Sequence, residues 1–94
     1  MRRLTWDEFA EAEGTTFEVE GEDSPRVEMT LEAATELPSA GREGGSFRLE
    51  FRGPFEPVLP QGIYGFHRGD ERRDIFIVPI GREEEGTRYE AVFY

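Results

Sequence analysis

Residues 46–52 read SFRLEFR, and their alternation of apolar and charged side chains decides the fold class. Phe47, Leu49 and Phe51 fall on one face of an extended chain, whereas the arginines and the glutamate between them fall on the other. A period of two is typical of a strand that has one buried and one solvated face. The stretch therefore predicts an antiparallel sheet that packs on one side.

The same period recurs on both sides of this stretch. Residues 15–20 (TTFEVE) and 26–34 (RVEMTLEAA) alternate in the same way, with Ala33 as the last inward residue of the second segment. Residues 73–80 (RDIFIVPI) are apolar at successive positions, which favours a strand covered on both faces. We therefore expect six strands, at 15–20, 26–34, 46–52, 62–68, 73–80 and 87–94.

The inward positions of these strands are the expected core. They are Phe17, Val19, Val27, Met29, Leu31, Phe47, Leu49, Phe51, Ile75, Ile77, Tyr89 and Phe93. If the second and third strands pair antiparallel, Glu28 and Glu32 of one strand face arginines of the other. These arginines are Arg48 and Arg52. Opposite charges across a strand pair contribute about 0.2–1 kcal/mol, so the charge pattern supports this pairing.

The N-terminus carries a helix signal. Thr5 and Glu8 have the spacing of a capping box, in which the side chain of each residue bonds to the backbone N–H of the other. We expect a short helix over residues 6–12. Because two turns are not stable alone, this helix must dock on the sheet, through Trp6 and Phe9.

These elements define one small domain. At 94 residues the chain has room for a single core, and residues 1–94 form one unit with no linker. The pattern predicts a mostly β fold, a small six-stranded antiparallel barrel or sandwich with one short N-terminal helix.

Charge and composition exclude several functions. The formal net charge is −10, from 21 acidic and 11 basic residues, which disfavours contact with nucleic acid or with an anionic membrane. The chain has no cysteine, so it carries no disulfide or thiolate site. No apolar run approaches the roughly 20 residues of a membrane span, and the N-terminus does not resemble a signal peptide. We expect a cytoplasmic protein.

The segment 54–60, PFEPVLP, combines prolines with large apolar side chains. Its two PxxP spacings are compatible with a ligand for a partner's groove. The alternative is a buried connector whose Phe55, Val58 or Leu59 plugs one end of the sheet, since such apolar mass is costly to expose. We favour the plug.

No catalytic, cofactor or metal site is predicted. The single histidine, His67, falls on the outward side of a strand and is interpreted as a surface residue. The acidic segments 21–25 and 81–86 lack EF-hand spacing and are interpreted as solvated turns. The tripeptide RGD at 68–70 is interpreted as a hairpin turn rather than an adhesion motif. The protein is not expected to be an enzyme.

Four short motifs carry a family resemblance. FRGP, LPQGIY, VPIG and the closing YEAVF together resemble an uncharacterised family of small bacterial proteins, a domain of unknown function. The resemblance covers residues 47–94 best. It implies a structural or assembly role, through an association with phage-tail-like assemblies, and it carries no catalytic residue over to this chain.

We therefore expect a non-catalytic structural or protein-interaction domain whose partner is another protein or a second copy of itself. The candidate interaction surface is Val92 and Tyr94, apolar residues on the outward face of the last strand, where earlier strands carry charges. The alternative is a domain that binds a small ligand, a carbohydrate or a metal ion at a barrel mouth or an acidic loop. The sequence identifies no partner.

Overall fold

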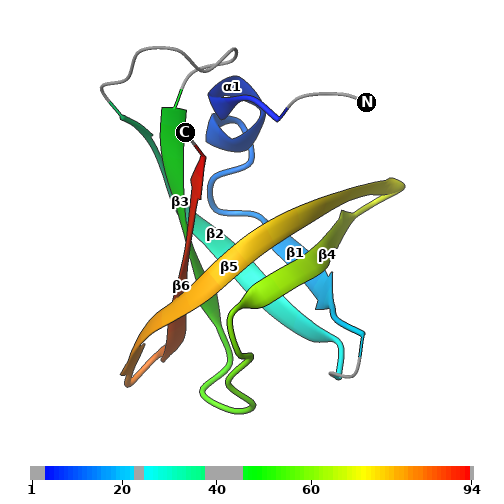
Figure 1. The fold of residues 1–94 in the computed structure, drawn as a ribbon, viewed down its shortest axis with the longest axis vertical. Coiled ribbons are helices and arrows are strands. Elements are labelled where there is room, and N and C mark those ends of the chain that lie inside the picture. The colour runs from blue at the N-terminus through cyan, green and yellow to red at the C-terminus, as the bar shows by residue number, and fades with distance from the viewer. Residues whose placement is uncertain (1–3, 23–24, 38–45, 94) are drawn as a thin grey trace.

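The computed structural model describes residues 4–22, 25–37 and 46–93. Six antiparallel strands close into a ring in the order β1-β2-β3-β6-β5-β4, with one helix at one end (Figure 1). The elements are α1 (Trp6–Ala10), β1 (Thr16–Glu20), β2 (Val27–Leu37), β3 (Ser46–Gly53), β4 (Gly62–Arg68), β5 (Glu71–Glu83) and β6 (Gly86–Phe93). All six expected strands are present, and of the two expected architectures the structure is the closed barrel.

The core is the interior of the ring, filled by the expected residues. Eleven of the twelve are at most 8% exposed, and Phe93 is partly buried against them. Rings supply much of the packing: Phe17 meets Phe51 edge-on with centroids 6.1 Å apart, and Phe51 lies 4.7 Å from Phe66. The alternation of apolar residues in the sequence thus corresponds to the inside of the barrel.

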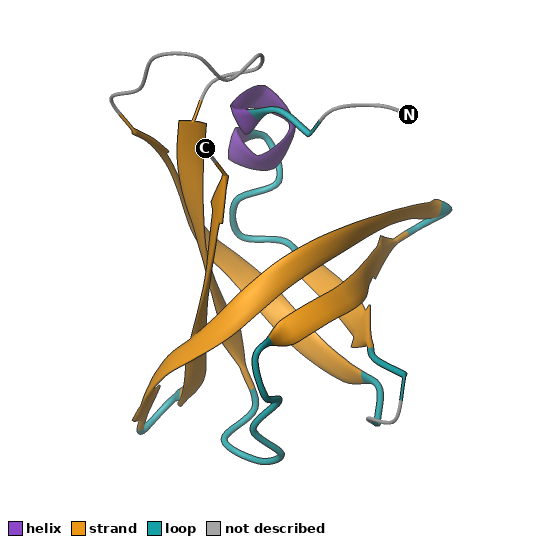
Figure 2. Ribbon diagram, in the orientation of Figure 1, coloured by secondary structure: helices purple, strands orange, loops and turns teal. Residues whose placement is uncertain are grey.

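The helix α1 covers one end of the barrel (Figure 2). Its capping box is present, with the Thr5 backbone N–H donating to Glu8 Oε1 at 3.2 Å. The Phe9 ring lies 5.8 Å from that of Phe47, and Trp6 Nε1 donates to the Ala34 carbonyl at 3.0 Å. The helix is shorter than the expected 6–12, because the chain turns after Ala10, but its docking residues are the expected ones.

The connector between β3 and β4 closes the opposite end. Leu59 is 2% exposed, and its backbone N–H donates to the buried Tyr89 hydroxyl at 2.9 Å. Phe55 and Val58, in contrast, are 51% and 39% exposed. The interpretation as a buried connector is therefore confirmed, and of its three candidate plugs Leu59 is the one that points into the barrel.

A β-bulge changes the pattern in β2. The register with β3 shifts between Leu31 and Ala33, so that Ala34 rather than Ala33 returns to the core. Of the two glutamates expected to face Arg48 and Arg52, Glu32 contacts Arg52 at 3.3 Å. Glu28 faces neither arginine.

The two unmatched residues lie on different strand pairs. Glu28 stands opposite Glu18 of β1, whereas Arg48 stands opposite Thr35 of β2 and contacts Glu90 of β6 at 2.6 Å. The sequence correctly indicated that β2 and β3 are neighbours, but not which of their residues pair.

The strand β5 is not covered on both faces, as its apolar sequence led us to expect. Ile75 and Ile77 are buried in the core, but Phe76 between them is 51% exposed. The ring provides a single interior, and α1 packs mainly on β2 and β3 at the end of the barrel, where it leaves Phe76 on the outside of β5 exposed. The outward residues of β5 therefore face solvent.

Candidate apolar contact surface

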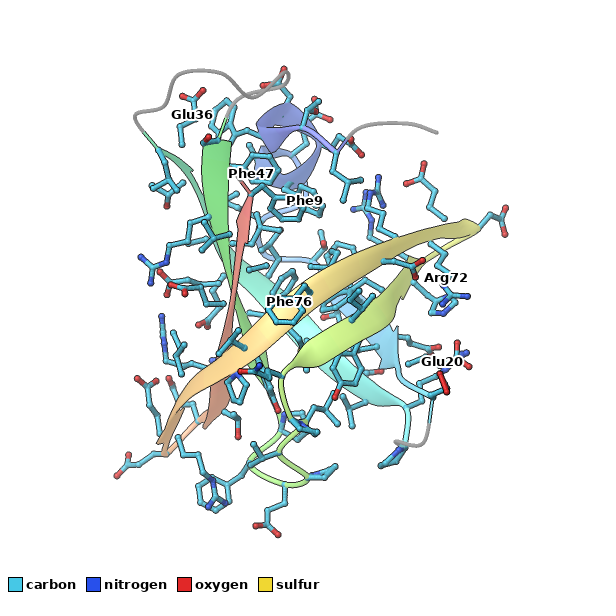
Figure 3. All side chains as sticks on the ribbon, in the orientation of Figure 1. Phe9, Glu20, Glu36, Phe47, Arg72 and Phe76 are labelled. Atoms are coloured by element: carbon cyan, nitrogen blue, oxygen red, sulfur yellow. The ribbon has the colours of Figure 1, made fainter. Side chains whose placement is uncertain are left out.

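An apolar strip runs along the outside of β4 and β5. We define it as Ile63, Phe76, Val78 and Ile80. Ile63 of β4 is the register partner of Phe76 of β5, and these two side chains are 69% and 51% exposed. Figure 3 shows Phe76 on the face of β5 that is turned toward the viewer. Ile80 is 45% exposed at a bulge between Pro79 and Gly81, and Val78 is half-buried.

The strip has a simple origin in the sequence. Only every second residue of β5 faces the barrel interior. A stretch that is apolar at successive positions, such as IFIVPI, therefore also places apolar residues on the outside. A signal for their exposure was available: a chain with one short helix has no second layer to cover that face.

A shallow hollow of about 380 Å³ adjoins the Ile63 end of the strip. It is lined by Glu20, Gly21, Glu22, Ile63, Gly65, Arg72 and Asp74. Gly65, one of the lining residues, has no side chain, and the Arg72 guanidinium lies against it: a Cβ on Gly65 would be 2.6 Å from Arg72 Nε. Arg72 Nη2 is also 3.1 Å from Asp74 Oδ1. The hollow combines three carboxylates with one arginine, and we call it the acidic hollow.

The Glu20 carboxylate is held ionised at the edge of this hollow. His67 Nε2 lies 2.9 Å from Glu20 Oε1, and Arg26 Nη2 donates to the same oxygen at 3.0 Å. These hydrogen bonds, that of His67 first and then that of Arg26, hold the pKa of Glu20 below its ordinary value. The negative charge of the hollow is therefore present at neutral pH.

A second apolar feature lies on the connector loop. The Arg82 guanidinium carbon stacks 3.9 Å from the centroid of the exposed Phe55 ring. Arg82 Nη2 also donates to the Phe55 carbonyl at 3.3 Å, and Thr87 Oγ1 donates to it at 3.4 Å. The exposed ring is thus held in place by contacts to the β5–β6 hairpin.

Residues 4–93 match the model of one protein family, described as a domain of unknown function (DUF6916). The chain belongs to this family. No curated protein and no solved structure matched the chain. Membership confirms the resemblance drawn from the sequence, and the whole of the described barrel lies within the DUF6916 domain.

Within this DUF6916 domain, Val92 lies on the outer face of β6, half-buried, with Arg48 as its register partner on β3. It is two residues beyond Glu90, which pairs with Val78 of the strip. Tyr94 lies outside the described residues. β6 pairs with both neighbours from Thr87 to Glu90, whereas Val92 lies beyond its last β5 partner and pairs with β3 alone.

The other residues considered in the sequence have structural partners. His67 is half-buried, and its ring bonds to a carboxylate, Glu20. Arg68 and Glu71 pair at the end of the β4–β5 hairpin, so the RGD tripeptide forms the expected turn, with Gly69 at φ +63°. In the acidic segment 81–86, Glu83 and Glu85 face arginines of the outer wall.

Two further findings concern the described part of the chain. Its histidine and acidic side chains form no group of three or more that could hold a metal ion. Among the same residues, no helix is long and apolar enough to span a membrane.

Proposed function

We propose that this DUF6916 domain is a non-catalytic protein-contact module that binds its partner through the apolar strip. The observation that carries the proposal is the pairing of Ile63 with Phe76, two large apolar side chains more than half exposed and side by side on adjacent strands. Contiguous apolar surface on a small domain is costly to leave in water and marks contact sites.

The contrast with the rest of the outer wall supports this proposal. On β2, β3 and β6 the outward positions carry an ion-pair network, in which Arg88 contacts both Glu32 and Glu50. Among the described residues of that wall, apolar Val92 is half-buried, whereas Ile63 and Phe76 of the strip are more than half exposed. A role in an assembly such as the phage-tail-like ones implied by the sequence resemblance requires a stable contact face of this kind.

The alternative, a small ligand at a barrel mouth, has less support. One mouth is filled by α1 through Phe9, and the other by Leu59, both at most 2% exposed. A ligand at either mouth would have to displace a core side chain, which costs several kcal/mol.

The test is site-specific photo-crosslinking in cells of the source organism. A crosslinking amino acid replaces Ile63 in one variant and Glu36 in another; Glu36 is exposed on β2, far from Phe76 (Figure 3). We expect a discrete adduct at position 63 that is absent at 36 and is lost when Phe76→Glu is added. Equal adducts at both positions, an adduct unaffected by Phe76→Glu, or no adduct at position 63 would contradict the proposal.

A further inference from the structure

The apolar strip ends in negative charge on both sides. At the Ile63 end lies the acidic hollow, with Glu20, Glu22 and Asp74. At the other end the β5–β6 turn carries the exposed residues 83–85, all glutamates. From Asp74 to Glu83 the extended strand spans about 30 Å, the length of about nine extended residues of a partner.

The arginines near the strip neutralise part of this charge, because Arg72 and Arg26 pair with two carboxylates of the hollow, whereas Glu22 has no ion pair among the described residues. Arg72 is paired with Asp74, and Arg82 with Glu56 as well as the Phe55 ring. Arg26 is bound to Glu18 and Glu20.

These charges favour a different protein, rather than a second copy of this chain, as the partner that binds the apolar strip. Two copies would each bring a net charge of −10 and the same acidic ends to the contact. Like charges across an interface are unfavourable, whereas a positively charged segment would be attracted.

We propose that the apolar strip receives a segment of a different protein with an apolar centre and basic flanks, and that one of its arginine or lysine side chains enters the acidic hollow. This inference rests on the proposed function and names the chemistry of its partner. The hollow suits such a side chain: Ile63 offers apolar contact to its methylene stem, while the Glu22 carboxylate accepts hydrogen bonds from its charged end.

The experiment is a selection from an unbiased library of random peptides, about twelve residues long, displayed on phage. The bait is the full chain, and binders that also bind the Phe76→Glu variant are discarded. We expect the remaining peptides to be enriched in arginine and lysine beside apolar residues. Their synthetic forms should lose about tenfold in affinity when salt is raised from low to high concentration.

A matched pair of variants locates the charge effect. Glu22→Gln removes a carboxylate from the hollow, and Glu36→Gln removes one from an exposed position on β2. We expect Glu22→Gln to weaken the selected peptides about threefold or more and Glu36→Gln to leave them unchanged. Equal effects of the two would overturn the placement of the basic side chain in the hollow.

The outcomes separate this inference from the proposed function. Peptides that depend on Phe76 but lack basic residues would overturn the inference and leave the contact function standing. No Phe76-dependent peptide at all would overturn both. Sedimentation of the wild type and of Phe76→Glu tests whether the chain binds a second copy of itself through the strip. We expect monomers for both proteins. A dimer that requires Phe76 would show that the partner is a copy of this chain and not a different protein.

Discussion

Leu59 and Phe55 show how differently two apolar residues of one loop contribute to stability. Leu59 is 2% exposed and fills an end of the barrel, whereas Phe55 is 51% exposed on the outside. Leu59→Ala should therefore lower the free energy of unfolding by about 2–5 kcal/mol, from lost burial and the cavity left behind. Phe55→Ala should cost less than about 1 kcal/mol. Urea denaturation measures both, and equal losses would show that the loop is not anchored as described.

Gly86 is a position where a methyl group has no room. Its φ is +141°, and a Cβ there would lie 2.1 Å from the Gly53 carbonyl oxygen. Gly86→Ala should cost at least about 2 kcal/mol, because a strained backbone adds to a clash with backbone atoms that cannot rotate away. Gly81→Ala is the control, since nothing lies within 4 Å of its Cβ position. Thermal unfolding of the two variants should separate them; a similar melting temperature would contradict the close approach.

At the scale of elements, α1 is joined to β5 by a buried ion pair. Arg73 Nη2 contacts Glu8 Oε2 at 2.8 Å and Glu71 Oε1 at 2.9 Å, and its side chain is 8% exposed. Burial disfavours the charged guanidinium, but the two carboxylates outweigh it, so the pKa of Arg73 is raised. The short helix thus depends on a side chain from a strand far along the sequence.

Arg73→Gln should destabilise the domain by about 1–3 kcal/mol, because the charge-assisted bonds from Arg73 to Glu8 and Glu71 are lost. Arg72→Gln next to it should cost about 0–1 kcal/mol, since both partners of that ion pair are more than half exposed. Chemical denaturation measures the difference. Adding Glu8→Gln to Arg73→Gln should cost less than the sum of the single changes, and strict additivity would argue against the pair.

The elements that the sequence predicted well are those in which each residue's neighbours along the chain decide its role. SFRLEFR alternates because every second residue faces the core, and Thr5 caps a helix three residues before Glu8. The bulge between Leu31 and Ala33 and the exposure of Phe76 depend instead on partners distant in sequence. The apolar strip was missed for this reason, since an apolar run does not reveal whether a second layer will cover it.

At the scale of the whole molecule, the buried Tyr89 hydroxyl links stability to alkaline pH. Burial raises its pKa above the ordinary value of 10.0, more than the hydrogen bond from Leu59 lowers it. A group whose pKa is raised on folding stabilises the native state below its unfolded pKa and loses that contribution as the pH rises through the folded value. The stability should therefore fall above about pH 10.

Tyr89→Phe tests this linkage. It should cost about 1–3 kcal/mol at neutral pH, because the buried Leu59 N–H loses its acceptor. The same change should flatten the decline in stability above about pH 10. Urea titrations from about pH 8 to about pH 11 compare the two proteins, and an unchanged slope in the variant would assign the alkaline loss to other groups.

The shortest strand pairing in the ring, between β1 and β4, should affect the order of folding and local opening. The β1–β4 ladder, from Glu18↔His67 to Glu20↔Gly65, is the shortest in the ring and joins residues distant in sequence. We expect this ladder to form last during folding and to open most easily in the native state. Its amides should therefore exchange hydrogen with a lower free energy of opening than those between β3 and β6. Uniform exchange around the ring would contradict this. Because Glu20 and Gly65 also line the acidic hollow, a bound partner would bridge β1 and β4 and slow hydrogen exchange in the ladder between them.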